Sequence, residues 1–255
     1  MKIAVVGALP HELKPLLKRV KLQGQLRTHA SPTALSKSHS KEAWYHATYR
    51  KHEIVIATTG IGIDNAEEAL TALLDAFNAD FLLSVGFAGA LYEGARIGDL
   101  VMAASVSLVS GNAIKSVLVS DERGLYEGLG GSTGARAGSF FTLETLMEKK
   151  AVKLLVPPDA AFPVCDMETF PLAELARKRQ LRFLAVRSIT DLADEEIPPE
   201  FLEVTDSSGR YQFIRAAGLL LRKPWLIPMA AKLKRRSITA SMSLWHAFDA
   251  LAHAL

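Results

Sequence analysis

The pattern of apolar and polar positions predicts strands that alternate with helices. Compact apolar runs predict strands, and they fall at 2–7, 44–49, 54–58, 80–91, 98–109 and 183–189. Apolar positions spaced three or four residues apart predict helices within 10–20, 64–77 and 168–179. The strand in 80–91 is expected to end in a glycine turn. The polar stretch 22–41 predicts a mobile loop, and the glycine-rich stretch 110–137 gives no clear pattern.

Strands that are apolar throughout are typical of a sheet covered on both faces. We therefore expect an α/β fold with three layers, α/β/α, around a central mixed, twisted β-sheet. Nothing in the composition marks a break between two halves, so residues 1–255 are expected to form a single domain. Ligands of such folds bind outside the carboxyl ends of the strands, and candidate residues are sought there.

Composition and charge narrow the class of protein. Apolar residues make up 49% of the 255 residues and charged residues 22%, which is ordinary for a globular chain. The net charge of +3 gives no case for binding nucleic acid. The single cysteine, Cys165, excludes an internal disulfide, and no Cys/His set has zinc spacing, so no metal is expected. The amino-terminal apolar run is too short for a secretory signal, and a cytoplasmic location fits best.

Acidic residues and glycine turns collect at the predicted strand ends. Glu12 follows the first strand, Glu168 opens a helix, and Asp191 follows the last strand. Singly, each acid can be a helix cap and each glycine a tight turn. Together they predict a site for a neutral, hydroxyl-rich ligand with a group for proton transfer. The glycine turns are "TGIG" with Gly60 and "VGFAGA" with Gly86, Ala88 and Gly89.

Five segments, in this order, resemble the purine nucleoside phosphorylase and nucleosidase superfamily, most closely its methylthioadenosine/S-adenosylhomocysteine nucleosidase branch. The resemblance implies an enzyme that cleaves the N-glycosidic bond of a purine nucleoside of the adenine type. It implies no cofactor, and a homodimer or higher homo-oligomer. The segments run from residue 1 to about residue 195 and read "MKIAVVGALPHEL", "TTGIGIDNAEEAL", "LLSVGFAGAL" with "RIGDLV", "VCDMET" and "VRSITDLAD".

The resemblance also implies roles for individual residues. Asp191 matches the general acid that protonates N7 of the leaving purine, and Glu12 matches the base that activates water. Glu168, helped by Met167, matches the residue that holds the ribose hydroxyls. Phe141 matches an aromatic residue that stacks on the base. The glycine turns would line the substrate through Gly60, Gly86, Ala88 and Gly89.

Cleavage of an N-glycosidic bond explains these residue types. Positive charge develops on the ribose and negative charge on the departing base, so an acid and a base on opposite sides of the bond both help. To act as the acid near neutral pH, Asp191 must hold its proton, as a carboxyl with restricted access to water can. Asp194, three residues further on, could tune or orient Asp191 or could be a surface group, and we interpret it as a surface group.

The sequence departs from the phosphorylases of this superfamily at their phosphate site. Their hexameric branch carries an arginine where this chain has Gly98, and Arg96 would point elsewhere on an extended backbone. With Glu12 present, this favours water as the nucleophile. Phosphorolysis, with phosphate as co-substrate held by Arg187 or by a lysine in 22–41, stays an alternative. A nucleoside-binding protein without activity is a second one.

The carboxyl-terminal extension, about 211–255, is longer than a compact nucleosidase requires. A helix packed on the domain would explain it, and so would peripheral contact with an anionic membrane surface. Relatives associated with hopanoid synthesis have a similar extension, which keeps a lipid-linked nucleoside of the adenosylhopane type as an alternative substrate. The extension contains Trp225, Trp245 and a basic cluster of Arg222, Lys223, Lys232, Lys234, Arg235 and Arg236.

Overall fold

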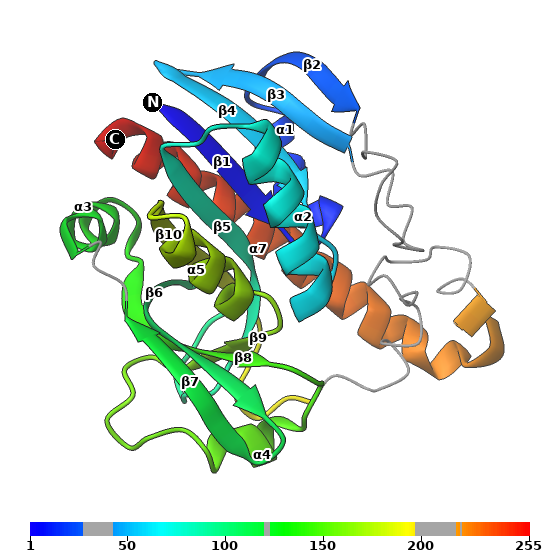
Figure 1. Cartoon of the computed structure of the whole chain (residues 1–255). Coiled ribbons are helices and arrows are strands. Elements are labelled where there is room, and N and C mark those ends of the chain that lie inside the picture. Colours follow the sequence, from blue (N-terminus) through cyan, green and yellow to red (C-terminus); the bar gives the residue numbers. More distant parts are fainter. Residues whose placement is uncertain (28–42, 120–122, 197–217, 220) are drawn as a thin grey trace, which may run out of the picture.

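The computed structural model describes residues 1–27, 43–119, 123–196, 218–219 and 221–255 (Figure 1). The strands are β1 (Lys2–Gly7), β2 (Lys21–Arg27), β3 (Ala43–Tyr49), β4 (His52–Thr58), β5 (Phe81–Ala90), β6 (Leu100–Ser110), β7 (Ala113–Val119), β8 (Arg136–Leu143), β9 (Val164–Asp166) and β10 (Arg182–Asp191). The helices are α1 (Pro10–Leu17), α2 (Ile63–Ala76), α3 (Arg123–Thr133), α4 (Lys149–Lys153), α5 (Thr169–Lys178), the short 3₁₀ helix η2 (Pro224–Leu226) and α7 (Ile227–Ala254).

The ten strands described form one mixed sheet, which confirms the expected mixed sheet. At its centre β4, β1, β5 and β10 run parallel to one another. Strand β9 pairs with both β5 and β8, while β10 pairs with both β5 and β6. Because β6 also pairs with β8, the five strands β5, β10, β6, β8 and β9 close into a ring of pairings. Because β1, β5 and β10 run parallel, their carboxyl ends lie at the same edge of the sheet.

Helices cover both faces of the sheet, which confirms the three-layer α/β/α expectation (Figure 1). Along β1 the side chains alternate: Ile3 and Val5 pack with α1, α3 and α7, whereas Ala4 and Val6 pack with α2 and α5. A two-residue side-chain period with both faces apolar produces this arrangement. The central strands are therefore buried on both sides, and their ends are the places where polar side chains can gather.

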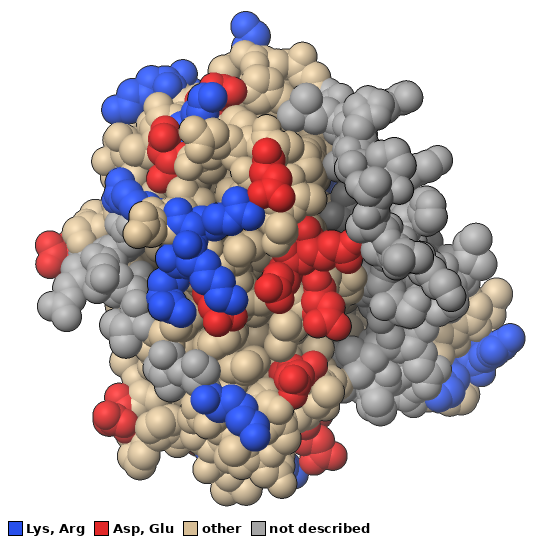
Figure 2. Space-filling view, viewed as in Figure 1, with Lys and Arg blue, Asp and Glu red and all other residues tan. Residues whose placement is uncertain are grey.

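Helices α2 and α5 pack side by side on one face and carry opposite charge. Figure 2 shows basic side chains gathered over α5 and acidic ones over α2. Arg179, directly after α5, donates to Asp75 of α2 at 2.8 Å. This pair is largely exposed, so its contribution to stability is small, about 0–1 kcal/mol.

Helix α7 is the longest helix described, at 28 residues, and it is part of the fold rather than an appendage. Its apolar stripe, Ala240, Leu244, Phe248 and Leu251, is buried against the sheet and α1. The ring of Trp245 lies 5.5 Å from that of Tyr49 on β3, edge to face. Among the described residues, no helix is long and apolar enough to cross a membrane.

Three expectations about local structure are corrected. The stretch 22–41 was expected to be a loop, but β2 occupies its first residues because Lys21–Arg27 pair with β3. Residues 28–42 of that stretch lie outside the described part of the chain. The motif "VGFAGA" is no turn, because Gly86 and Gly89 lie inside β5 and pair with β10. The unassigned stretch 110–137 contains β7, α3 and the start of β8.

Candidate active site

The candidate site lies along the second half of β5. The register of the parallel pair β5–β10 sets Gly86 beside Arg187 and Gly89 beside Asp191. A bulge between Ile189 and Asp191 interrupts this register. Bulges re-aim side chains, and this one falls at the predicted general acid.

Glu12 is buried in the first turn of α1, directly after β1. Its two carboxylate oxygens accept hydrogen bonds from backbone amides, one from Leu9 at 2.8 Å and one from Phe87 of β5 at 2.9 Å. Burial raises the pKa of Glu12 above its ordinary value, although these amides and Arg187 act in the opposite direction. Glu12 is therefore a fixed carboxylate and a stronger base than an exposed one.

Gly86 lets two charged groups approach the strand closely. A Cβ at this position would lie 3.3 Å from a carboxylate oxygen of Glu12 and 3.3 Å from the guanidinium of Arg187. Both contacts are tight for a side chain. The glycine was predicted to permit a close approach to a ligand, and here it permits the approach of Glu12 and Arg187.

Glu168 caps α5 and reaches back to the turn before α2, where its carboxylate accepts the Gly62 amide at 2.9 Å. Burial, together with the nearby Asp166 and Glu12 carboxylates, raises the pKa of Glu168 to about 8, against the opposing effects of the Gly62 amide and Arg187. Because the Glu12 carboxylate contributes to raising the pKa of Glu168, the two glutamates interact electrostatically. Gly62 itself has φ 94°, a backbone conformation that favours glycine.

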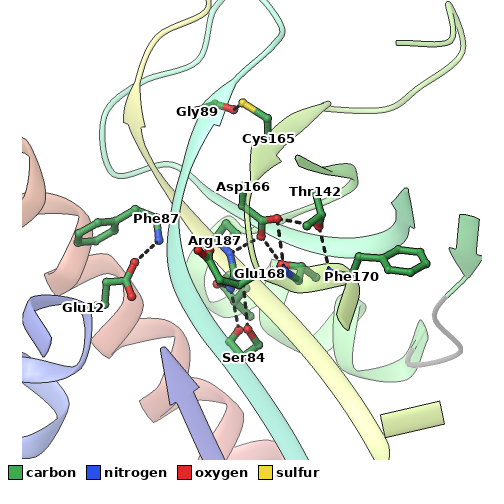
Figure 3. A network of polar contacts seen from close by, with 12 residues as sticks. Glu12, Ser84, Phe87, Gly89, Thr142, Cys165, Asp166, Glu168, Phe170 and Arg187 are labelled. Carbon is green, nitrogen blue, oxygen red and sulfur yellow. Dashed lines mark hydrogen bonds and ion pairs between the residues drawn. The ribbon is translucent and has the colours of Figure 1, made fainter. Parts of the chain in front are cut away.

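Arg187 is the centre of a buried polar network (Figure 3). Its Nε donates to Asp166 at 2.8 Å, and its terminal nitrogens donate to Ser84 and, at 2.6 Å, to Thr169. Arg187 is 2% exposed. The suggestion that Arg187 binds phosphate is not supported, because its guanidinium is committed to internal partners. Its observed contacts instead fix the segment that carries Glu168.

Asp191 has a partner that sequence reasoning missed, the side chain of Lys149 at the start of α4. The ammonium forms a buried ion pair with Asp191 Oδ2 and donates to the Leu192 carbonyl at 2.6 Å. Asp191 Oδ1 accepts from the Thr190 hydroxyl at 2.9 Å. A Cβ at Gly89 would lie 2.5 Å from Asp191 Oδ2 and 2.9 Å from Lys149, so only glycine leaves room for this pair.

The other predicted site residues occupy different surroundings. Gly60 lies in the turn after β4, Ala88 is buried in β5, and Met167 is half-buried just before Glu168. Phe141 is 1% exposed and packs in an apolar cluster with Leu91, Val109, Leu143 and Val152. Its ring offers no open surface to a base here, so stacking stays a prediction. Phe87 is a half-buried aromatic that was overlooked; its ring lies 5.3 Å from that of His11.

An open groove of about 740 Å³ lies elsewhere, between α3, α7 and the start of β6. Gly98, Gly134 and His246 are among its lining residues, and none of the three site carboxylates is. In the described part of the chain, no group of three or more His, Cys, Asp or Glu residues is arranged to hold a metal ion. The chemistry available along β5 is that of carboxylates, one ammonium and backbone amides.

Comparison with known proteins assigns the chain to a family. The phosphorylase superfamily matches residues 2–124 and 127–216, and the chain belongs to this superfamily. An aminodeoxyfutalosine nucleosidase of Campylobacter jejuni is 26% identical over 82% of this chain and 94% of its own length. A 5'-methylthioadenosine/S-adenosylhomocysteine nucleosidase of an Exiguobacterium species is 25% identical over 82% of this chain and 93% of its own length.

Solved structures of similar fold come from the same group of enzymes. A 5'-methylthioadenosine/S-adenosylhomocysteine nucleosidase of Campylobacter jejuni superposes with a TM-score of 0.71 over all of both chains, at 22% identity. An S-adenosylhomocysteine nucleosidase of Streptococcus pyogenes, in complex with 5-methylthiotubericidin, has a TM-score of 0.71 at 16% identity and covers 100% of this chain and 97% of its own. These likenesses confirm the mixed α/β fold.

Proposed function

We propose that this protein hydrolyses the N-glycosidic bond of a purine nucleoside of the adenine type, with Glu12 activating water and Asp191 as the group that passes a proton to the leaving base. The observation that carries the proposal is the convergence of Glu12, Glu168 and Asp191 on the carboxyl-terminal half of β5 and its neighbours. Relatives at about 25% identity are nucleosidases, which supports the reaction class.

Glu12 suits the role of general base. Both of its oxygens accept hydrogen bonds from backbone amides, so the carboxylate is already oriented and needs no reorganisation at the moment of reaction. Burial raises its pKa, which increases its affinity for the proton of a water molecule. Water activated here would attack the anomeric carbon of the ribose.

Glu168 suits the role of ribose anchor. The buried carboxyl group of Glu168 has one oxygen held by the Gly62 amide, and with its raised pKa it can accept hydrogen bonds from the hydroxyls of a sugar or, when protonated, donate to them. Its position is fixed because Arg187 donates hydrogen bonds to Asp166 and Thr169, on either side of Glu168 at the start of α5. Phosphorolysis is disfavoured by the same contacts, because Arg187 is not available to a phosphate ion.

The test is to incubate the purified protein with methylthioadenosine, adenosine, inosine and futalosine, each with and without phosphate. We expect free base and free sugar from an adenine nucleoside at rates that phosphate does not change. Glu12→Gln should lower kcat by about 10²-fold or more, because an amide cannot take the proton of water. An absolute requirement for phosphate, with ribose 1-phosphate as product, would contradict hydrolysis.

We also propose that the segment from Leu221 through η2 to the start of α7 makes peripheral contact with an anionic lipid surface. Leu221 is 84% exposed and Trp225 is 67% exposed, and Arg222, Lys234 and Arg235 are exposed nearby in sequence. Exposed apolar side chains flanked by bases are typical of interfacial segments. A lipid-linked nucleoside would then be among the substrates to try.

A further inference from the structure

Lys149 is a buried lysine that nothing in the proposed hydrolysis has so far used. It begins α4, after the loop that follows β8, and it is 6% exposed, whereas the next residue, Lys150, is exposed. Its ammonium is directed to the end of β10, where it contacts the Asp191 carboxylate and the Leu192 carbonyl. A lysine is rarely buried unless it is paired, so this side chain is held by Asp191.

The surroundings make Asp191 the charge partner of Lys149. Burial raises the pKa of the neighbouring Cys165 to about 12, so its thiol stays neutral. Glu196 accepts the backbone amide of Lys149, and the nearby Arg236 is held by Glu195. Asp166 is neutralised by Arg187. The ammonium has three N–H groups, and the described residues account for two of them, at Asp191 and Leu192.

This ion pair raises a difficulty for the proposed acid. An ion pair joins a protonated amine to an ionised carboxylate. In the resting pair the proton is therefore on the Lys149 nitrogen, and the Asp191 carboxylate has none to give. Asp191 alone cannot be the source of the proton that the leaving base needs.

Resting on the proposed function, we infer that Lys149 and Asp191 form a two-residue acid in which Lys149 supplies the proton and Asp191 passes it to the base. As the glycosidic bond breaks, its electron pair stays on the purine. The purine takes a proton from Asp191, and Asp191 takes one from the Lys149 ammonium. Lys149 is left as a neutral amine, which regains a proton from solvent once the base has left, while Glu12 returns to solvent the proton that it took from the attacking water. Lys149 acts through Asp191 and is a positioning and proton-supplying residue.

The test compares two leaving groups. A purine needs a proton to depart, whereas 4-nitrophenolate leaves as a stable anion from 4-nitrophenyl β-D-riboside. Lys149→Met should lower kcat on the purine nucleoside by about 10²-fold or more and leave nitrophenolate release nearly unchanged. Lys149→Arg should show the same selective loss, because a guanidinium keeps the charge but does not give up a proton. Lys150→Met and Lys150→Arg, on the exposed neighbour, should match the wild type on both substrates.

Two outcomes would overturn the inference. Equal losses on both substrates would mean that Lys149 only supports the fold, and full purine activity in Lys149→Arg would mean that only its charge matters. The split between kcat and KM is a second readout: Lys149→Arg should lower kcat for the purine nucleoside and leave KM nearly unchanged. A wild type that releases base from no nucleoside would instead contradict the proposed function, before any variant is compared. If Lys149→Met does not fold, Lys149→Arg still decides.

Discussion

Glu12 and Asp191 are both buried carboxylates, but their partners differ in charge. Glu12 accepts neutral backbone amides, so burial dominates and its pKa rises, which suits a base. Asp191 instead forms an ion pair with the Lys149 ammonium. Environment rather than residue type therefore separates their proposed roles.

At Asp191 we expect Asp191→Asn to lower kcat for base release by about 10²- to 10⁴-fold, because an amide of the same shape cannot pass on a proton. The substitution also leaves the Lys149 ammonium without its carboxylate, so some loss of stability is expected. Substrate affinity, measured by calorimetry, should change far less than kcat. Steady-state kinetics on a purine nucleoside provide the main measurement.

Asp194 provides the matched control, since it is an exposed aspartate three residues further along the chain. Asp194→Asn should leave both kcat and melting temperature close to those of the wild type. Near-normal turnover in Asp191→Asn would remove Asp191 from the mechanism, together with the inference about Lys149.

Sequence reasoning located part of the site because parallel strands share one edge. That rule, with the resemblance, singled out Glu12, Glu168 and Asp191. It missed Lys149 because "MEKKAVK" has the composition of an exposed helix, and only the fold shows which lysine turns inward. It misjudged Arg187, since the partners of a buried arginine come from distant segments such as β5 and β9.

Helix α7 contacts the site through the turn after β10. Arg236 donates to both carboxylate oxygens of Glu195, at 2.5 and 2.9 Å, and to the Thr190 carbonyl at 3.4 Å. Glu195 in turn accepts the amide of Leu192, whose carbonyl holds Lys149. The helix thus fixes the backbone on either side of Asp191.

Arg236→Gln should loosen this turn, lowering the free energy of unfolding by about 1 kcal/mol and kcat by up to about 10²-fold. Hydrogen bonds from Arg236 lower the pKa of Glu195 in the folded state. The stabilisation is therefore present in full above the ordinary carboxyl value of about 4.3. It begins to be lost below that value and is lost completely only as the pH falls through the lower, folded-state value. Denaturant unfolding of both proteins at pH 7 and pH 3.5 measures this.

The neighbouring Arg235 is exposed, so Arg235→Gln is the control and should leave unfolding and kcat unchanged. A stability difference between wild type and Arg236→Gln that is as large at pH 3.5 as at pH 7 would mean that the Glu195 ion pair is not its source.

Elements were predictable where one physical signal was strong. The buried strands β1, β4, β5 and β10 follow from apolar runs, because both of their faces are covered. Strand β2 was missed because it is polar and lies at the edge of the sheet, where backbone pairing with β3 alone defines it. The pairings that close the ring also involve β9, which is three residues long and too short for a periodic pattern.

At the scale of the whole molecule, the two ends of α7 differ. Its second half is buried against the sheet, whereas its start and η2 extend away from the layers, with exposed apolar residues (Figure 1). Figure 2 shows basic side chains at that end. The basic cluster expected from sequence is not uniform, because Lys232 and Arg236 are paired with Glu195. This leaves Arg222, Lys234 and Arg235 as the exposed bases to test.

We expect the protein to float with vesicles of anionic phosphatidylserine at low salt and to be released at high salt. Each base near the surface contributes about 1 kcal/mol, and salt screens that attraction. Lys234→Gln with Arg235→Gln should therefore reduce flotation, and Trp225→Ser should reduce it by removing the exposed ring. The matched control is Arg177→Gln with Lys178→Gln on α5, which removes the same charge from another face. Equal flotation of the two double variants would show that net charge alone accounts for the binding. Equal binding of the wild type to neutral vesicles would show nonspecific adhesion. Either result would mean that α7 serves only to support the turn beside Asp191.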